Sequence, residues 1–227
     1  MKHIVSFVIA CLICIAYPAT TIAQENYQIP EEMPINNGEL DWLTFKDQNG
    51  EIKLGKKELT LCSKKKSYFY SAYLPKPTMT YSKVPLDTKG DFYLSIKLKP
   101  NKIDENTLFG LVLNVANEAD YNAIAFDNQF CYFLRIMCVN GIYIIQGKED
   151  RVQYKYIKQD KDMWTIAVER KNGGDYIVTL NGLEIRTIPG TLELMFPSIG
   201  VFADNKCEVK ATHVAYTQWA AAPESNE

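Results

Sequence analysis

The sequence has 227 residues, of which 47% are hydrophobic and 12% aromatic, and a formal net charge of −2 at pH 7. A chain so close to neutrality gives no reason to expect nucleic acid or an anionic lipid surface as a partner. The composition is that of a globular protein without low-complexity tracts, and the length suits one large β-domain or two small ones.

The first 23 residues have the pattern of a secretory signal peptide. Lys2 gives a positive start, residues 4–16 are apolar, and Thr21-Ile22-Ala23 offers small residues for cleavage. The break at Pro18 makes the apolar run too short for a membrane span. We therefore expect cleavage after Ala23 and export to the periplasm, the cell surface or the medium.

A lipid anchor is the alternative for this leader, because residues 8–11, Val-Ile-Ala-Cys, resemble a bacterial lipobox that ends at Cys11. The apolar run ahead of Cys11 is short for such a signal, which favours the cleaved signal peptide. Removal of residues 1–23, which contain one lysine and no acid, leaves 204 residues with a net charge of −3.

The mature chain is predicted to be one β-domain over residues 39–219, preceded by an extended lead-in at residues 24–38 and followed by a flexible tail at residues 220–227. Short runs rich in β-branched and aromatic residues alternate with turn residues along the domain, which predicts strands. Residues 192–196 are compatible with a single helical turn. We expect strands at residues 40–45, 51–54, 58–62, 67–74, 90–100, 107–115, 120–126, 129–139, 142–146, 151–157, 163–171, 176–180, 183–188, 198–203 and 208–217.

Two Asn-Gly dipeptides predict tight hairpins. Asn140-Gly141 and Asn181-Gly182 each separate two strand-like runs, and Asn-Gly supplies the two positive φ angles of a type I′ turn. Residues 107–147 are therefore expected to form an antiparallel meander that is apolar enough to be buried. With no amphipathic helix of useful length, the sequence predicts an all-β, two-sheet antiparallel sandwich.

Four cysteines remain after removal of the leader: Cys62, Cys131, Cys138 and Cys207. Cys131 and Cys138 are seven residues apart on one predicted strand, so their Cα atoms would be about 23 Å apart, whereas a disulfide needs roughly 4.4–6.8 Å. Export permits the other pairings, and buried free thiols are the equal alternative. None of these four cysteines has a C-x-x-C spacing, and only one histidine follows the leader, so we expect neither a metal site nor a cofactor.

Three parts of the second half share a strand pattern with a known group of proteins: residues 91–100 with 109–114, residues 164–170 with 176–182, and residues 199–204 with 209–216. They resemble the concanavalin A-like lectin and glucanase superfamily, and within it secreted domains of Bacteroidota related to the 3-keto-disaccharide hydrolase group. The resemblance spans roughly residues 90–217 and implies a curved jelly-roll sandwich. It rests on turn and core residues, so it bears on the fold more than on an activity.

Members of that superfamily that cleave β-glucans use a strand motif with three acids, E-x-D-x-x-E. The similar positions here are Glu118, Asp120 and Ala123, so the third acid is missing. Retaining glycoside hydrolysis needs two carboxyl groups about 5–5.5 Å apart. We therefore expect residues 117–120 to form a hairpin loop and not a catalytic site.

Arg135 stands out because it interrupts an otherwise apolar strand at residues 132–139. A buried guanidinium is costly unless it is paired, and its planar fork suits bidentate recognition of polar groups. Two interpretations stay open: Arg135 binds sugar in the groove of the jelly roll, or it forms a buried ion pair with an acid such as Glu169.

The candidate ligand-binding residues are Arg135, Tyr121, Asn114, Asp127 and Tyr73. Tyrosine offers a flat apolar face with a hydrogen-bonding tip, which suits a sugar ring. We expect an exported, non-catalytic protein whose partner is a poly- or oligosaccharide. The alternatives are a glycoside hydrolase or lyase with an unrecognised site, and an envelope protein-interaction module of the immunity or adhesin type.

Overall fold

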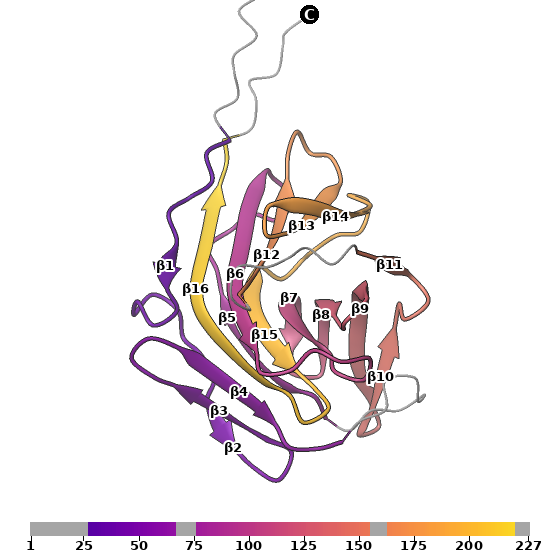
Figure 1. Cartoon of the computed structure of the whole chain (residues 1–227). Coiled ribbons are helices and arrows are strands. Elements are labelled where there is room, and N and C mark those ends of the chain that lie inside the picture. Colours follow the sequence, from indigo (N-terminus) through magenta and orange to yellow (C-terminus); the bar gives the residue numbers. More distant parts are fainter. Residues whose placement is uncertain (1–26, 67–75, 155–162, 221–227) are drawn as a thin grey trace, which may run out of the picture.

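The computed structural model describes residues 27–66, 76–154 and 163–220, which form two antiparallel β-sheets packed face to face (Figure 1). These residues contain no helix, and so none that is long and apolar enough to cross a membrane. Residues 192–196, which were compatible with a helical turn, form a turn and loop instead. The all-β sandwich that the sequence predicts is confirmed.

Sheet A has nine strands, and its longest is β16, which pairs with β6 on one side and with β4 and β1 on the other. In spatial order the strands are β14 (Leu183–Ile188), β13 (Tyr176–Leu180), β12 (Trp164–Arg170), β6 (Phe92–Pro100), β16 (Glu208–Gln218), β4 (Leu59–Ser63), β3 (Gly50–Leu54) and β2 (Phe45–Lys46), with β1 (Met33–Pro34) added to β16.

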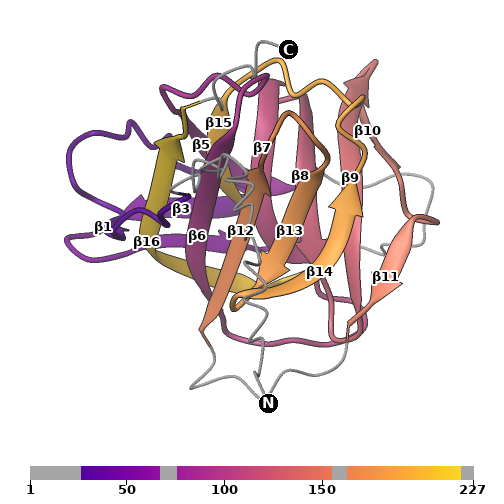
Figure 2. The ribbon, with the colours of Figure 1, turned by 90° about the horizontal axis from the view of Figure 1, so that it is seen from above.

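Sheet B has seven strands and contains the predicted meander as the consecutive strands β7 to β10. Figure 2 shows β6, β12, β13 and β14 of sheet A in front of β7, β8 and β9 of sheet B. In spatial order the strands are β10 (Ile142–Gln146), β9 (Phe130–Val139), β8 (Asp120–Phe126), β7 (Phe109–Asn117), β15 (Ser198–Ala203) and β5 (Thr78–Lys83), with β11 (Arg151–Gln153) paired to β9.

The edge strand β5 was not predicted. Its sequence, Thr-Met-Thr-Tyr-Ser-Lys, lies between Pro77 and Pro85, which read as loop residues. An edge strand tolerates such flanks because only one of its sides needs ladder hydrogen bonds. The strand expected at residues 40–45 is reduced to β2, and the one expected at residues 67–74 lies outside the described residues.

Both faces of sheet B bury apolar side chains. One face packs against sheet A in the main core, where the Trp164 ring meets Phe109 and Phe126 edge-on at centroid distances of 5.0 and 5.5 Å. The opposite face carries a second core, and this two-sided burial explains why β8 and β9 read as continuous apolar runs. The second core consists of Met79, Leu108, Val112, Val115, Tyr121, Ala123, Ala125, Tyr132, Leu134, Ile136, Ile145 and Phe202.

The predicted turn chemistry is confirmed at both Asn-Gly hairpins. Asn140 and Gly141 have φ angles of 52° and 79°, and Asn181 and Gly182 have 52° and 80°, as a type I′ turn requires. The four cysteines are free, and Cys131 and Cys138 lie on the single strand β9, as expected.

The two ends of the described domain lie side by side (Figure 1). β1 pairs with β16 through Met33 and Val214, and the Tyr27 ring contacts Trp219 edge-on at 4.8 Å. The backbone N–H of Trp219 also donates to the Asp91 carbonyl oxygen at the start of β6, at 2.9 Å. The last residues of the domain are therefore held to both its first segment and its central strand.

Candidate functional site

Three polar side chains lie next to one another on neighbouring strands of sheet B. Asn122 of β8 is directly opposite Arg135 of β9, and Arg135 is directly opposite Gln146 of β10. Directly opposite residues of an antiparallel pair project from the same face. We call Asn122, Arg135 and Gln146 the polar row.

Arg135 is exposed, which excludes the interpretation that it forms a buried ion pair, whereas sugar binding in the groove stays a prediction. Its side chain is 52% exposed, and its Nε and Nη2 donate to the Asp120 carboxylate at 3.3 and 3.1 Å. Glu169, the acid proposed as its partner, instead pairs with Lys171 at 3.1 Å. The apolar run around Arg135 misleads because Leu134 and Ile136 point to the opposite face, into the second core.

Asn114 is joined to the polar row through Asn122. Its Nδ2 donates to Asn122 Oδ1 at 2.8 Å, and its Oδ1 accepts the backbone N–H of Phe196 at 3.0 Å. Asn114 has a φ of 53° and lies in a bulge where β7 loses register with β8, between Leu113 and Asn117. Two predicted candidates, Asn114 and Arg135, thus meet at Asn122, which the sequence did not single out.

Tyr121 is part of the second core and not of a surface. Tyr121 is 1% exposed, and its hydroxyl has no hydrogen-bond partner among the residues that the structure describes. Burial raises the pKa of this hydroxyl well above its usual value. A sugar could contact Tyr121 only if the second core opened. Tyr73, the other tyrosine among the candidates, lies outside the described residues.

Asp127 lies at the other end of β8, in the turn to β9, and its carboxylate is largely used within the protein. Oδ1 accepts the backbone N–H groups of Gln129 and Phe130, each at 2.7 Å, and Oδ2 accepts the Tyr132 hydroxyl at 2.6 Å. Asp127 lines a hollow of about 340 Å³ together with Glu105, Asn106, Asn128, Gln129 and Phe130. Its bonding makes Asp127 the residue that shapes this turn, at the end of sheet B opposite the polar row.

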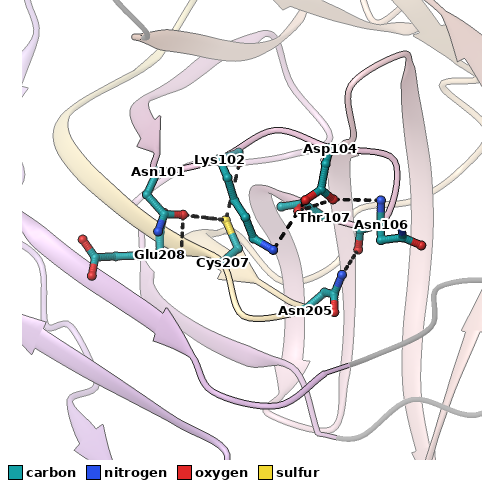
Figure 3. Close-up of polar contacts among 8 residues, drawn as sticks. All are labelled: Asn101, Lys102, Asp104, Asn106, Thr107, Asn205, Cys207 and Glu208. Carbon is teal, nitrogen blue, oxygen red and sulfur yellow. Dashed lines mark hydrogen bonds and ion pairs between the residues drawn. The ribbon is translucent and has the colours of Figure 1, made fainter.

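A polar network holds the loop beside that hollow to the turn between β15 and β16 (Figure 3). Asp104 accepts the Thr107 hydroxyl at 2.7 Å and the Asn106 backbone N–H at 3.0 Å, and these bonds lower the pKa of its carboxyl group. Asn205 donates to the Asn106 carbonyl oxygen. Burial raises the pKa of the neighbouring Cys207 thiol to about 12, so this cysteine is not a nucleophile at neutral pH.

A buried cation that sequence reasoning missed lies on β14. The Arg186 side chain is 5% exposed, and its Nη2 contacts Asp150 Oδ2 at 2.8 Å while Nη1 donates to the Asp150 carbonyl oxygen at 3.1 Å. The Asp150 side chain is 67% exposed. The signal was weak, since Arg186 occupies a short strand that also carries Glu184 and Thr187 and reads as solvent-facing.

Comparison with known proteins identifies the architecture. No protein-family model and no curated protein matches the chain. A native glycosidic hydrolase of known structure is 10% identical, with a TM-score of 0.52 over 86% of this chain and 98% of its own. The GH16 protein of a Bacteroides ovatus mixed linkage glucan PUL, solved with a G4G4G3G product, is 10% identical, with a TM-score of 0.50 over 82% of this chain and 99% of its own. The fold is a concanavalin A-like jelly roll.

The binding domain of botulinum neurotoxin serotype G matches with 9% identity and a TM-score of 0.47 over 86% of this chain. The chain spans about half the length of that domain, 49%. At identities of 10%, the likenesses to the glycosidic hydrolase and the GH16 protein show the jelly-roll fold alone.

The acids near the β7–β8 turn of this jelly roll are engaged in ion pairs. Glu118 lies in the turn and pairs with Lys76 at 3.4 Å, and Asp120 pairs with Arg135 at 3.1 Å. Ala123, in place of a third acid, is fully buried in the second core. The stretch is thus a hairpin turn, as predicted. Within the described part of the chain, no three His, Cys, Asp or Glu side chains are grouped to hold a metal ion.

Proposed function

We propose that this chain is an exported, non-catalytic protein that binds carbohydrate through the polar row. The observation that carries the proposal is the register of Asn122, Arg135 and Gln146 on three adjacent strands, with Arg135 half exposed. Strands lie about 4.8 Å apart, so the row spans roughly 10 Å. The exposed Arg135 guanidinium and Gln146 amide offer paired donors and acceptors, which suit the adjacent hydroxyls of a sugar ring. The Asn122 amide is buried and bonded to Asn114 and to the Leu134 carbonyl oxygen, so it supports the row from below.

Apolar surface next to the row favours a sugar over a small inorganic anion. Phe133 and Met137 alternate with Arg135 along β9 and therefore share its face, and both are half-buried. A sugar ring needs such a combination, because its C–H face packs on apolar side chains while its hydroxyls bond to polar ones.

Two further features support the proposal. The leader at residues 1–23 favours export, where polysaccharides occur. The place of a third acid is taken by buried Ala123, which favours binding without cleavage. The resemblance to secreted domains of Bacteroidota would place the protein among exported proteins of those bacteria.

A panel of immobilised polysaccharides, including mixed-linkage β-glucan, tests the proposal with the mature chain. Loss of a charge-assisted hydrogen bond costs about 1.5–3 kcal/mol, so Arg135→Ala should weaken binding roughly 10- to 100-fold. The Arg135–Asp120 pair is exposed, so the free energy of unfolding should change by less than about 1 kcal/mol. Lys53→Ala, which removes an exposed cation paired with Glu51 on sheet A, is the matched control and should leave binding unchanged.

Equal binding by Arg135→Ala and the unmodified chain would show that the polar row is not the site. Absence of binding to every polysaccharide of the panel would reject the function itself. Release of reducing sugar from any of them would instead establish the glycoside hydrolase alternative.

A further inference from the structure

A second hollow lies on the β5 side of sheet B. It has a volume of about 490 Å³, within the range of small-ligand sites. Its walls come from β5, the end of β7, and the segment that leads into β15. The lining residues are Tyr81, Lys83, Val84, Val115, Ala116, Phe196, Pro197 and Ser198. We call it the Phe196 hollow.

The aromatic ring of Phe196 is presented by a segment that is tied down at three points. The side chain is 41% exposed. The Phe196 N–H donates to Asn114 Oδ1 at 3.0 Å, and its carbonyl oxygen accepts the Ser198 hydroxyl at 3.1 Å. The Ser198 Oγ in turn accepts the Val115 N–H at 2.9 Å. An exposed aromatic side chain on a fixed backbone loses little freedom on binding a ligand, and this favours a recognition role over a chance exposure.

The hollow combines this ring with one cation. Tyr81 is half-buried beside Lys83, and Lys83 is the single charged residue that lines the hollow. No ion pair of Lys83 is formed with any residue that the structure describes. Tyr81 and Lys83 also line an adjoining hollow of about 270 Å³, which contains the acids Glu39 and Asp41. An aromatic wall beside an ammonium group that has no ion-pair partner among the described residues favours a ligand that is apolar on one face and anionic at its rim.

We propose that the Phe196 hollow is a second carbohydrate site, specific for a sugar that carries a carboxylate, such as a uronic acid. The ring face of the sugar packs on Phe196 and Tyr81, and the Lys83 ammonium group pairs with the sugar carboxylate. The site adds to the proposed function and uses none of the residues of the polar row. β5 and β9 are four strand steps apart, or about 19 Å, so Lys83 and Arg135 are too far apart to contact the same sugar ring.

An NMR titration with trigalacturonate, and with its methyl-esterified form as the neutral match, tests this site. Trigalacturonate should shift the backbone amides of Tyr81, Lys83 and Phe196. Lys83→Gln should weaken trigalacturonate at least about ten-fold and leave the weaker binding of the ester unchanged. Phe196→Ala should weaken both ligands, and Phe196→Leu should restore part of the loss. Met195→Ala, an exposed apolar change on the same segment outside the hollow, should have no effect.

Absence of shifts around the hollow at saturating trigalacturonate would overturn the proposal. Equal affinity for the acid and the ester, with no effect of Lys83→Gln, would also overturn it, since the carboxylate would then play no part. Polysaccharide binding by the Arg135→Ala variant tests the polar row independently of the Phe196 hollow. Failure at the hollow with binding intact at the row would leave the proposed function standing.

Discussion

At the scale of single residues, two arginines show how burial changes the contribution of an ion pair to the free energy of unfolding. Arg135 and Asp120 are both exposed, whereas buried Arg186 depends on the exposed carboxylate of Asp150. Asp150→Ala should therefore lower the free energy of unfolding by about 1–3 kcal/mol, because it removes the carboxylate that pairs with a buried guanidinium group and leaves only the backbone carbonyl oxygen as an acceptor. Asp120→Ala, its matched control, should cost less than about 1 kcal/mol. Urea denaturation measures both, and equal effects would mean that Arg186 reaches solvent.

The cysteines give a second prediction at this scale. Burial raises the pKa of the Cys131 and Cys207 thiols to about 12, whereas the usual value is near 9. Above pH 9 the unfolded chain therefore binds fewer protons than the folded one, so stability falls as the pH rises from about 9 towards 12. Below pH 9 these two thiols should contribute no pH dependence. Thiol labelling at pH 8 should modify half-buried Cys62 and Cys138 in the folded protein, and Cys131 and Cys207 only after unfolding.

At the scale of elements, the bulge in β7 connects the two proposed sites. Asn114 holds a left-handed backbone conformation and bonds to both Asn122 and Phe196. Asn114→Ala should lower the free energy of unfolding by about 2–3 kcal/mol, since it loses both bonds and strains the backbone. Asn114→Gly should cost less, because glycine accepts the positive φ without strain. Equal losses for the two variants would show that the backbone conformation contributes nothing.

The strands differed in how far the sequence alone could predict them. The meander was predictable because Asn140-Gly141 selects one turn type and the flanking runs are strongly apolar. β5 was missed because Thr78, Thr80 and Ser82 are buried although they are polar. An alternation without apolar residues does not predict a strand that is buried on one face. A buried ion pair of Arg135 stayed open as an interpretation because an apolar run does not reveal which of two faces is covered. Asn122 and Phe196 matter only through contacts that cross the sheet, and sequence spacing does not contain such contacts.

At the scale of the whole molecule, the two-sided burial of sheet B limits where a ligand can bind. The second core occupies the face opposite sheet A, with Tyr121, Tyr132 and Phe202 among its large side chains. The polar row lies on β8 to β10, on the face opposite to that core, and the Phe196 hollow lies at the edge of the core, where Tyr81 and Val115 line it. Recognition in this jelly roll is therefore proposed at the margins of the sheet, and tyrosines counted from the sequence overstate the aromatic surface that a sugar can reach.

The contact between Tyr27 and Trp219 bears on how the domain could be fused to, or inserted into, another protein. The two ends of the described domain are adjacent, so the sandwich can be attached to another protein at a single point. It can equally be spliced into a surface loop of a larger protein without parting any strands. A short linker between the two ends would close the backbone into a ring, and the Asn140-Gly141 turn then offers a place to reopen it, far along the chain from both ends.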